Sequence, residues 1–96
     1  MAKEKLLNDL EYINYEYGRY CGLWEHCNNR KELADLYFED MKIMANKYGI
    51  DYDKEIEKNN WEWNELINFG EEYVIDGMIF LLKNKIVEKI RFYLGD

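Results

Sequence analysis

Carboxylates and large aromatic rings alternate between Asp51 and Glu72, and these side chains have the clearest capacity for chemistry or recognition. The segment holds eight acidic residues and two lysines, a net charge of −6, whereas the whole chain carries −7. Carboxylates can transfer protons, bind cations or imitate phosphate groups, and aromatic rings can anchor a protein interface. Because most of the charge lies in one segment, we expect that segment to govern which partners approach.

Two groups of residues resemble metal sites but lack features that such sites need. Residues 51–62 have the acidic spacing of a calcium loop, but Ile56 occupies the position where the loop requires glycine. Cys21, His26 and Cys27 would spread around one helix and could not converge on a single ion. We therefore expect no metal and no cofactor, and we interpret the two cysteines as small thiols of the core.

The composition excludes whole classes of enzyme. The chain contains no Ser, Thr, Gln or Pro and only one His. Nucleophilic catalysis by a serine or threonine is therefore impossible, and a phosphate-binding loop with Gly-Lys-Ser/Thr cannot be formed. We expect a protein that is not an enzyme. The alternative, a small enzyme based on carboxylates or tyrosine, would require a concave pocket that holds a group with a perturbed pKa.

The source and location of the protein are also suggested by composition. Lys, Asn, Ile and Tyr are abundant, which is typical of AT-rich coding and favours a low-GC bacterium or one of its phages. The longest apolar run, Met78 to Leu82, is too short to span a membrane. No apolar signal segment follows Met1, so we expect a cytoplasmic protein with reduced cysteines.

The spacing of apolar residues predicts the elements that position these groups. A spacing that alternates between four and three predicts an amphipathic helix from about Lys3 to Cys27. Gly18 and Gly22 weaken this helix, so we expect another element to pack closely there. The predicted buried face consists of Leu6, Leu10, Ile13, Tyr17, Tyr20, Trp24 and Cys27.

Asn29 and Glu32 have the spacing of a capping box, which predicts the start of a second helix. Gly49 is expected to end that helix in the left-handed conformation, followed by a hydrophobic contact from Ile50. Two helices joined by so short a link should form an antiparallel hairpin. The apolar face of the second helix would contain Leu33, Tyr37, Met41, Met44 and Tyr48.

Two interpretations remain for the chain after Asp51. In the alternative one, Asp76-Gly77 is a hairpin turn and residues 72–94 form a three-stranded antiparallel meander, which would make the fold α+β. In the favoured one the chain is helical, and the predicted fold is a small all-α bundle built on the N-terminal helix hairpin, with one domain over residues 1–96. Its two apolar stripes would be Ile56, Trp63, Ile67, Gly70 and Val74, and then Ile75, Ile79, Leu82, Ile86, Ile90 and Tyr93.

Two candidate binding surfaces follow from the helical interpretation. Five carboxylates between Asp51 and Glu72 would share one ridge, within about 100° of one another, with two rings in or beside it. The alternative is an ordinary solvated face that keeps the protein soluble. The back of the first helix either packs inside the protein or faces a partner. The predicted partner-binding residues are Asp51, Glu55, Trp61, Glu62, Glu65, Phe69, Glu72, Tyr12, Tyr15 and Arg19.

These features lead to a functional hypothesis. We expect a small acidic inhibitor that occupies a basic, nucleic-acid-binding surface of a larger protein or nucleoprotein. An anti-defence protein of the anti-CRISPR type is the favoured class, and an immunity or antitoxin protein that neutralises a basic toxin is the alternative. We expect no membrane partner and no direct nucleic-acid binding, because the only basic surplus lies in residues 83–91. Aromatic residues on two faces of the first helix are compatible with a homodimer.

Overall fold

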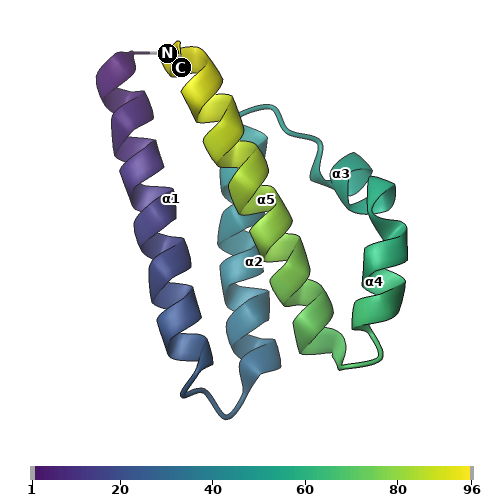
Figure 1. The fold of residues 1–96 in the computed structure, drawn as a ribbon. Helices are drawn as coiled ribbons and strands as arrows, with labels where there is room; N and C mark the ends of the chain where they lie inside the picture. The colour runs from purple at the N-terminus through teal and green to yellow at the C-terminus, as the bar shows by residue number, and fades with distance from the viewer. Residues whose placement is uncertain (1, 96) are drawn as a thin grey trace.

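The part of the chain that the structure describes is mainly helical. A computed structural model describes residues 2–95, and within this range it contains no strand. The helices are α1 (Lys3–Trp24), α2 (Arg30–Lys47), α3 (Tyr52–Lys58), α4 (Asn60–Leu66) and α5 (Glu71–Leu94), as Figure 1 shows. The predicted all-α class is therefore confirmed. The α+β alternative is wrong, because residues 72–94 lie in the single continuous helix α5.

Burial explains why helix prevails over strand in α5. Ile79, Leu82, Ile86 and Ile90 are completely buried, and their spacing places them on one face only in a helix. Each such side chain contributes about 1.5–3 kcal/mol when it leaves water. Tyr93, the last residue of the predicted stripe, is instead half exposed, because the stripe reaches the end of the bundle there.

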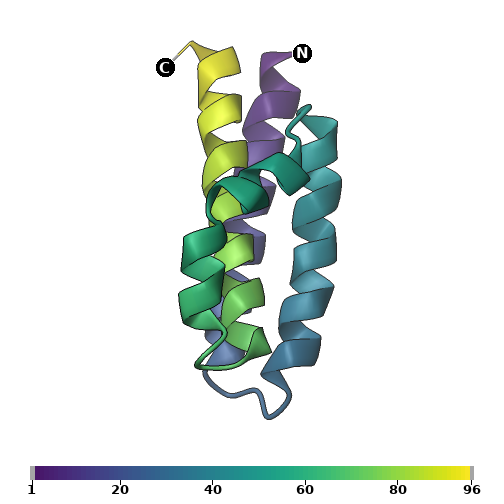
Figure 2. The same ribbon diagram turned by 90° about the vertical axis from the view of Figure 1, so that its right-hand side faces the viewer.

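The three long helices form the body of the molecule. The helices α1 and α2 run in opposite directions, and α5 packs against both (Figures 1 and 2). The main packing partner of α2 is α5, so the structure does not confirm a bundle built on the hairpin of the first two helices. The core that these helices enclose includes Leu6, Ile13, Tyr20, Ala34, Tyr37, Met41, Met44, Ala45 and Tyr48.

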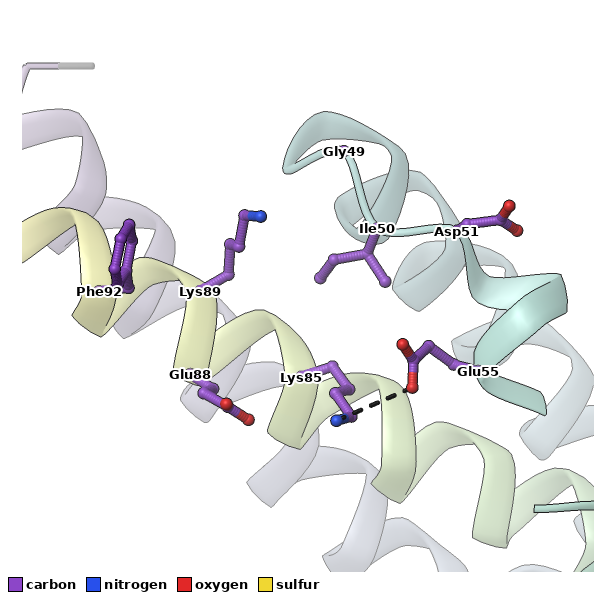
Figure 3. Close-up of a pocket in the computed structure, with 8 residues that line it drawn as sticks. All are labelled: Gly49, Ile50, Asp51, Glu55, Lys85, Glu88, Lys89 and Phe92. Carbon is purple, nitrogen blue, oxygen red and sulfur yellow. Dashed lines mark ion pairs between the residues drawn. The ribbon is translucent and has the colours of Figure 1, made fainter. Parts of the chain in front are cut away.

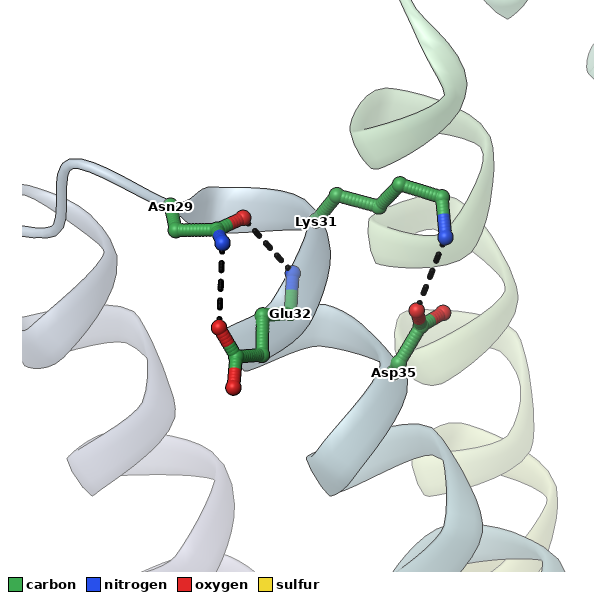
Figure 4. Close-up of polar contacts among 4 residues, drawn as sticks. All are labelled: Asn29, Lys31, Glu32 and Asp35. Atoms are coloured by element: carbon green, nitrogen blue, oxygen red, sulfur yellow. Dashed lines mark hydrogen bonds and ion pairs between the residues drawn. The ribbon is translucent and has the colours of Figure 1, made fainter.

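Both ends of α2 have the predicted local structure. The Asn29 side chain accepts a hydrogen bond from the Glu32 amide at 3.2 Å and donates one to the Glu32 carboxylate at 3.0 Å (Figure 4). Gly49 has a φ of 69°. The Ile50 amide donates to the Ala45 carbonyl at 2.9 Å, which closes a Schellman motif. The capping residues therefore fix where α2 starts and stops.

Two expectations for α1 are wrong. A β-carbon at Gly18 or Gly22 would meet no atom within 4 Å, so no element packs closely there. Cys21 is an exposed free thiol and not part of the core, and Cys27 is a half-buried free thiol in the turn after α1. Among residues 2–95, none of the helices combines the length and the apolar character that a membrane crossing requires.

The predicted stripe from Ile56 to Val74 is interrupted twice, so this part of the helical interpretation is wrong. Asn59 ends α3 by donating from its side chain to the Glu55 carbonyl at 2.9 Å, as asparagine commonly does at helix ends. Gly70, with a φ of 136°, precedes α5 in a conformation that only glycine adopts freely. Because the chain turns at these two points, Ile67 is half exposed and not buried.

Candidate protein-binding surface

Residues 51–72 form a separate layer on one side of the bundle, which we call the acidic wing. Figures 1 and 2 show α4 lying along α5 and α3 crossing from the end of α2 to α5, on the side away from α1. Trp63 holds the wing against α5. Its ring is 7% exposed and packs where α5 has Gly77, and its Nε1 donates to the Ile56 carbonyl at 2.6 Å. One side chain therefore connects α3, α4 and α5.

The wing carboxylates do not share the single ridge that the sequence predicts. Asp51 caps α3, where its side chain accepts from the Lys54 amide at 3.3 Å. Glu72 lies in the first turn of α5, across the break at Gly70. The ridge is wrong because it assumes an unbroken helix, and the acids instead lie on α3, on α4 and in the first turn of α5. Glu55 belongs to α3, whereas Glu62 and Glu65 belong to α4.

One of the wing acids, Glu55, forms ion pairs with lysine. The Glu55 carboxylate lies 3.8 Å from Lys85 on α5 and 3.6 Å from Lys58. Glu55 thus links the wing to the bundle, so we no longer treat it as a free binding carboxylate. The other wing acids form no ion pair with residues 2–95, and they are exposed or half-buried: Asp51, Asp53, Glu57, Glu62, Glu65, Glu71 and Glu72.

The two predicted aromatic anchors of the wing lie outside the core, and their predicted exposure is confirmed. Trp61 is 64% exposed and Phe69 is 71% exposed. Trp61 is on α4 two residues before the buried Trp63, so the two indoles point to opposite sides of the same short helix. Phe69 lies in the turn before α5, with its ring 6.2 Å from that of Tyr73. Large rings are therefore available at both ends of α4.

An open groove borders the wing, and the sequence analysis did not predict it. It has a volume of about 410 Å³ and lies between the C-terminal half of α5 and the start of α3 (Figure 3). Its lining mixes both charges with apolar surface. Because the two segments are far apart in the chain, only the helical spacing of Lys85, Lys89 and Phe92 hinted at a shared face. The lining residues are Gly49, Ile50, Asp51, Glu55, Lys85, Glu88, Lys89 and Phe92.

The remaining predicted binding residues lie on a second surface, which we call the α1–α2 face. Tyr12, Tyr15 and Arg19 are exposed on α1, so the back of this helix is not sandwiched within the chain. Burial, together with the nearby carboxylates of Glu16 and Asp40, raises the pKa of Tyr12. The structure therefore separates the predicted residues into two surfaces.

Comparisons of this chain with protein-family models, with curated proteins and with solved structures find no match.

Proposed function

We propose that the protein is a small acidic inhibitor that binds a basic, nucleic-acid-binding surface of a larger protein or nucleoprotein. The observation that supports this most is an exposed indole, Trp61, set among carboxylates that have no lysine partner. An ordinary solvated face would keep the acids but has no need of an exposed tryptophan. On this proposal the protein is not an enzyme.

The two kinds of side chain would divide the work of binding. The unpaired carboxylates create a local negative field that attracts a basic groove and accelerates encounter. The rings of Trp61 and Phe69 then supply the apolar contact area that holds the complex together. Trp63 and Gly77 keep the wing seated on the bundle, so the charges and rings are presented in a fixed arrangement at little entropic cost.

The biological class follows from this mode of binding. An anti-defence protein of the anti-CRISPR type, acting in the cytoplasm, fits a carboxylate surface that occupies a site meant for phosphates. The same surface would suit an immunity or antitoxin protein that covers a basic toxin. The gene beside the coding sequence distinguishes these classes, since a toxin gene supports the second and a phage operon the first.

Displacement of nucleic acid from the partner tests the proposal. The partner is purified from the native host on the immobilised protein, and its complex with labelled nucleic acid is followed by fluorescence anisotropy. One variant carries Glu57→Gln, Glu62→Gln and Glu65→Gln in the wing. Its control, with the same change in net charge, is the triple glutamine variant of three acids on or beside α1: Glu4, Glu11 and Glu25.

We expect the wild type and the control variant to displace the nucleic acid, and the wing variant to need at least about tenfold more protein. Two results would overturn the proposal. One is a partner that binds this protein and nucleic acid at the same time. The other is equal displacement by the wing variant and the control, which would show that the wing carboxylates are not the contact.

A further inference from the structure

The two short helices of the acidic wing add little to the core of the molecule. No residue of α3 is buried, and Trp63 is the only buried residue of α4. The buried core is formed by α1, α2, α5 and Tyr48 at the end of α2. From the wing, only the partly buried Tyr52 packs against that core, and its ring lies 5.9 Å from the ammonium group of Lys42. None of the buried core residues therefore belongs to α3 or α4.

Polar contacts between the wing helices and the bundle are also few. Among residues 2–95, no hydrogen bond joins α3 or α4 to α1, α2 or α5. In the described chain, the one ion pair between the two parts joins Glu55 to Lys85 at 3.8 Å, and both side chains are partly exposed. Such pairs contribute little to stability. The packing of Trp63 and Leu66 on Gly77 is therefore the main attachment of the wing.

The helices α3 and α4 depend on each other. Each has seven residues, and a helix shorter than roughly 12–15 residues is only marginally stable in water on its own. Nε1 of Trp63 in α4 donates to the Ile56 carbonyl in α3, so the indole that packs on α5 also joins the two short helices. Neither helix should persist once Trp63 leaves α5.

We propose that α3 and α4 open and unfold as one unit while α1, α2 and α5 stay folded. The closed state predominates, and the open state is a minor population in exchange with it. Segments with few buried apolar contacts are those that open in this way. Gly49 and Gly70 flank the unit, both with positive φ, and glycine has access to a wide range of backbone conformations. The chain can therefore change direction at both ends of the unit.

Opening of the wing would control partner binding. The open state does not hold Trp61, Glu62 and Glu65 in one arrangement, so only the closed fraction binds a basic surface, and a bound partner keeps the wing closed. This consequence rests on the proposed function, whereas the opening itself does not. The opening is therefore tested on the purified protein alone.

Native-state hydrogen exchange of the full chain, followed by NMR over urea concentrations below the unfolding transition, tests the proposal. We expect the slowest amides of α3 and α4 to exchange at least about tenfold faster than the slowest amides of α1, α2 and α5. The amides of both short helices should share one urea dependence. It should be weaker than that of the core amides, because opening of the wing exposes less surface than global unfolding.

Substitutions at the attachment show whether the two short helices act as one unit. Trp63→Ala should accelerate exchange in α3 and α4 by the same factor, at least about tenfold, although only α4 carries the change. Trp61→Ala, the same substitution at an exposed position of α4, is the matched control and should alter these rates less than about threefold. Gly77→Ala crowds Trp63 from α5 and should accelerate exchange in both short helices at least about fivefold.

Three results would overturn the proposal. Wing amides that share the protection and urea dependence of the core amides would show that the whole chain unfolds as one unit. Acceleration confined to α4 in Trp63→Ala and Gly77→Ala would show that the two helices open independently. Loss of the dispersed amide signals of α1, α2 and α5 in Trp63→Ala would show that the long helices need the wing in order to fold.

Discussion

Replacing Gly77 with alanine tests whether the acidic wing is seated on α5 as described. A β-carbon at this position would lie 2.9 Å from Cζ3 of Trp63 and 3.0 Å from Cδ1 of Leu66. Contacts this short force something to move. The indole ring is rigid and buried, so the layer formed by α3 and α4 must shift outward. The same substitution at Gly18, an exposed position within α1 with no neighbour within 4 Å, is the matched control.

The two substitutions share one favourable effect and differ in one unfavourable effect. Glycine in a helix interior is about 1 kcal/mol less favourable than alanine, so Gly18→Ala should raise the free energy of unfolding by about 1 kcal/mol. At Gly77 the same gain is opposed by overpacking, which typically costs about 1–3 kcal/mol. Gly77→Ala should therefore range from neutral to about 2 kcal/mol destabilising, and lie about 1–3 kcal/mol below Gly18→Ala.

Urea unfolding followed by far-ultraviolet circular dichroism and by tryptophan fluorescence measures both free energies. Trp63 is the buried indole of the wing, so its fluorescence should also change in folded Gly77→Ala and not in Gly18→Ala. If Gly77→Ala stabilised the protein as much as Gly18→Ala, with unchanged fluorescence, Trp63 would not be packed against α5. The wing would then not be held in a fixed position on the bundle by this contact.

Three further predictions follow from single contacts. The Tyr20 hydroxyl is buried and donates to Asp76 at 2.6 Å, which raises its pKa. The contribution of Tyr20 to the free energy of unfolding should therefore be constant below about pH 10 and be lost above it, and a flat alkaline profile of the free energy would contradict this. Asn29→Ala removes the cap of α2 and should cost about 1 kcal/mol in urea unfolding, whereas no loss would mean that the cap contributes nothing. Because Trp61 is largely exposed, Trp61→Ala should change the free energy of unfolding by less than about 0.5 kcal/mol. It should weaken partner binding, measured by calorimetry, by at least about 2 kcal/mol. Unchanged binding would exclude Trp61 as an anchor.

Local signals in the sequence predicted those parts of the fold that depend on neighbouring residues. The capping box at Asn29 and the glycine stop at Gly49 act over a single turn, and both occur where the sequence places them. The apolar spacing of α5 favoured a helix without excluding the three-stranded alternative, and the structure decides for the helix. Prediction failed where the outcome depended on contacts between distant segments.

The wing shows this limit most clearly. Asn68 and Gly70 are residue types typical of turns, but the predicted stripe ran through Gly70, and that the chain turns there to pack Trp63 against Gly77 depends on a later helix. In the sequence Gly77 resembled a turn residue. Its role is to leave room for Trp63 and Leu66 of α4, and this contact exists only in the folded protein. The exposure of Trp61 and Phe69 could be predicted from their place outside the apolar stripe. The pairing of Glu55 with Lys85 could not, because it joins two helices whose relative position is tertiary.

The central claim, that the unpaired carboxylates of the wing guide this protein to a basic surface, is tested most directly by the association rate constant. Stopped-flow measurements with the purified partner over a range of salt concentrations give this constant for the wild type, the wing variant and the α1 control. Because exposed charges are screened by salt, the wild-type rate constant should fall at least about tenfold from low to high salt. The wing variant should start slower and depend less on salt, while the control should follow the wild type. A wild-type rate constant that does not change with salt would contradict the account.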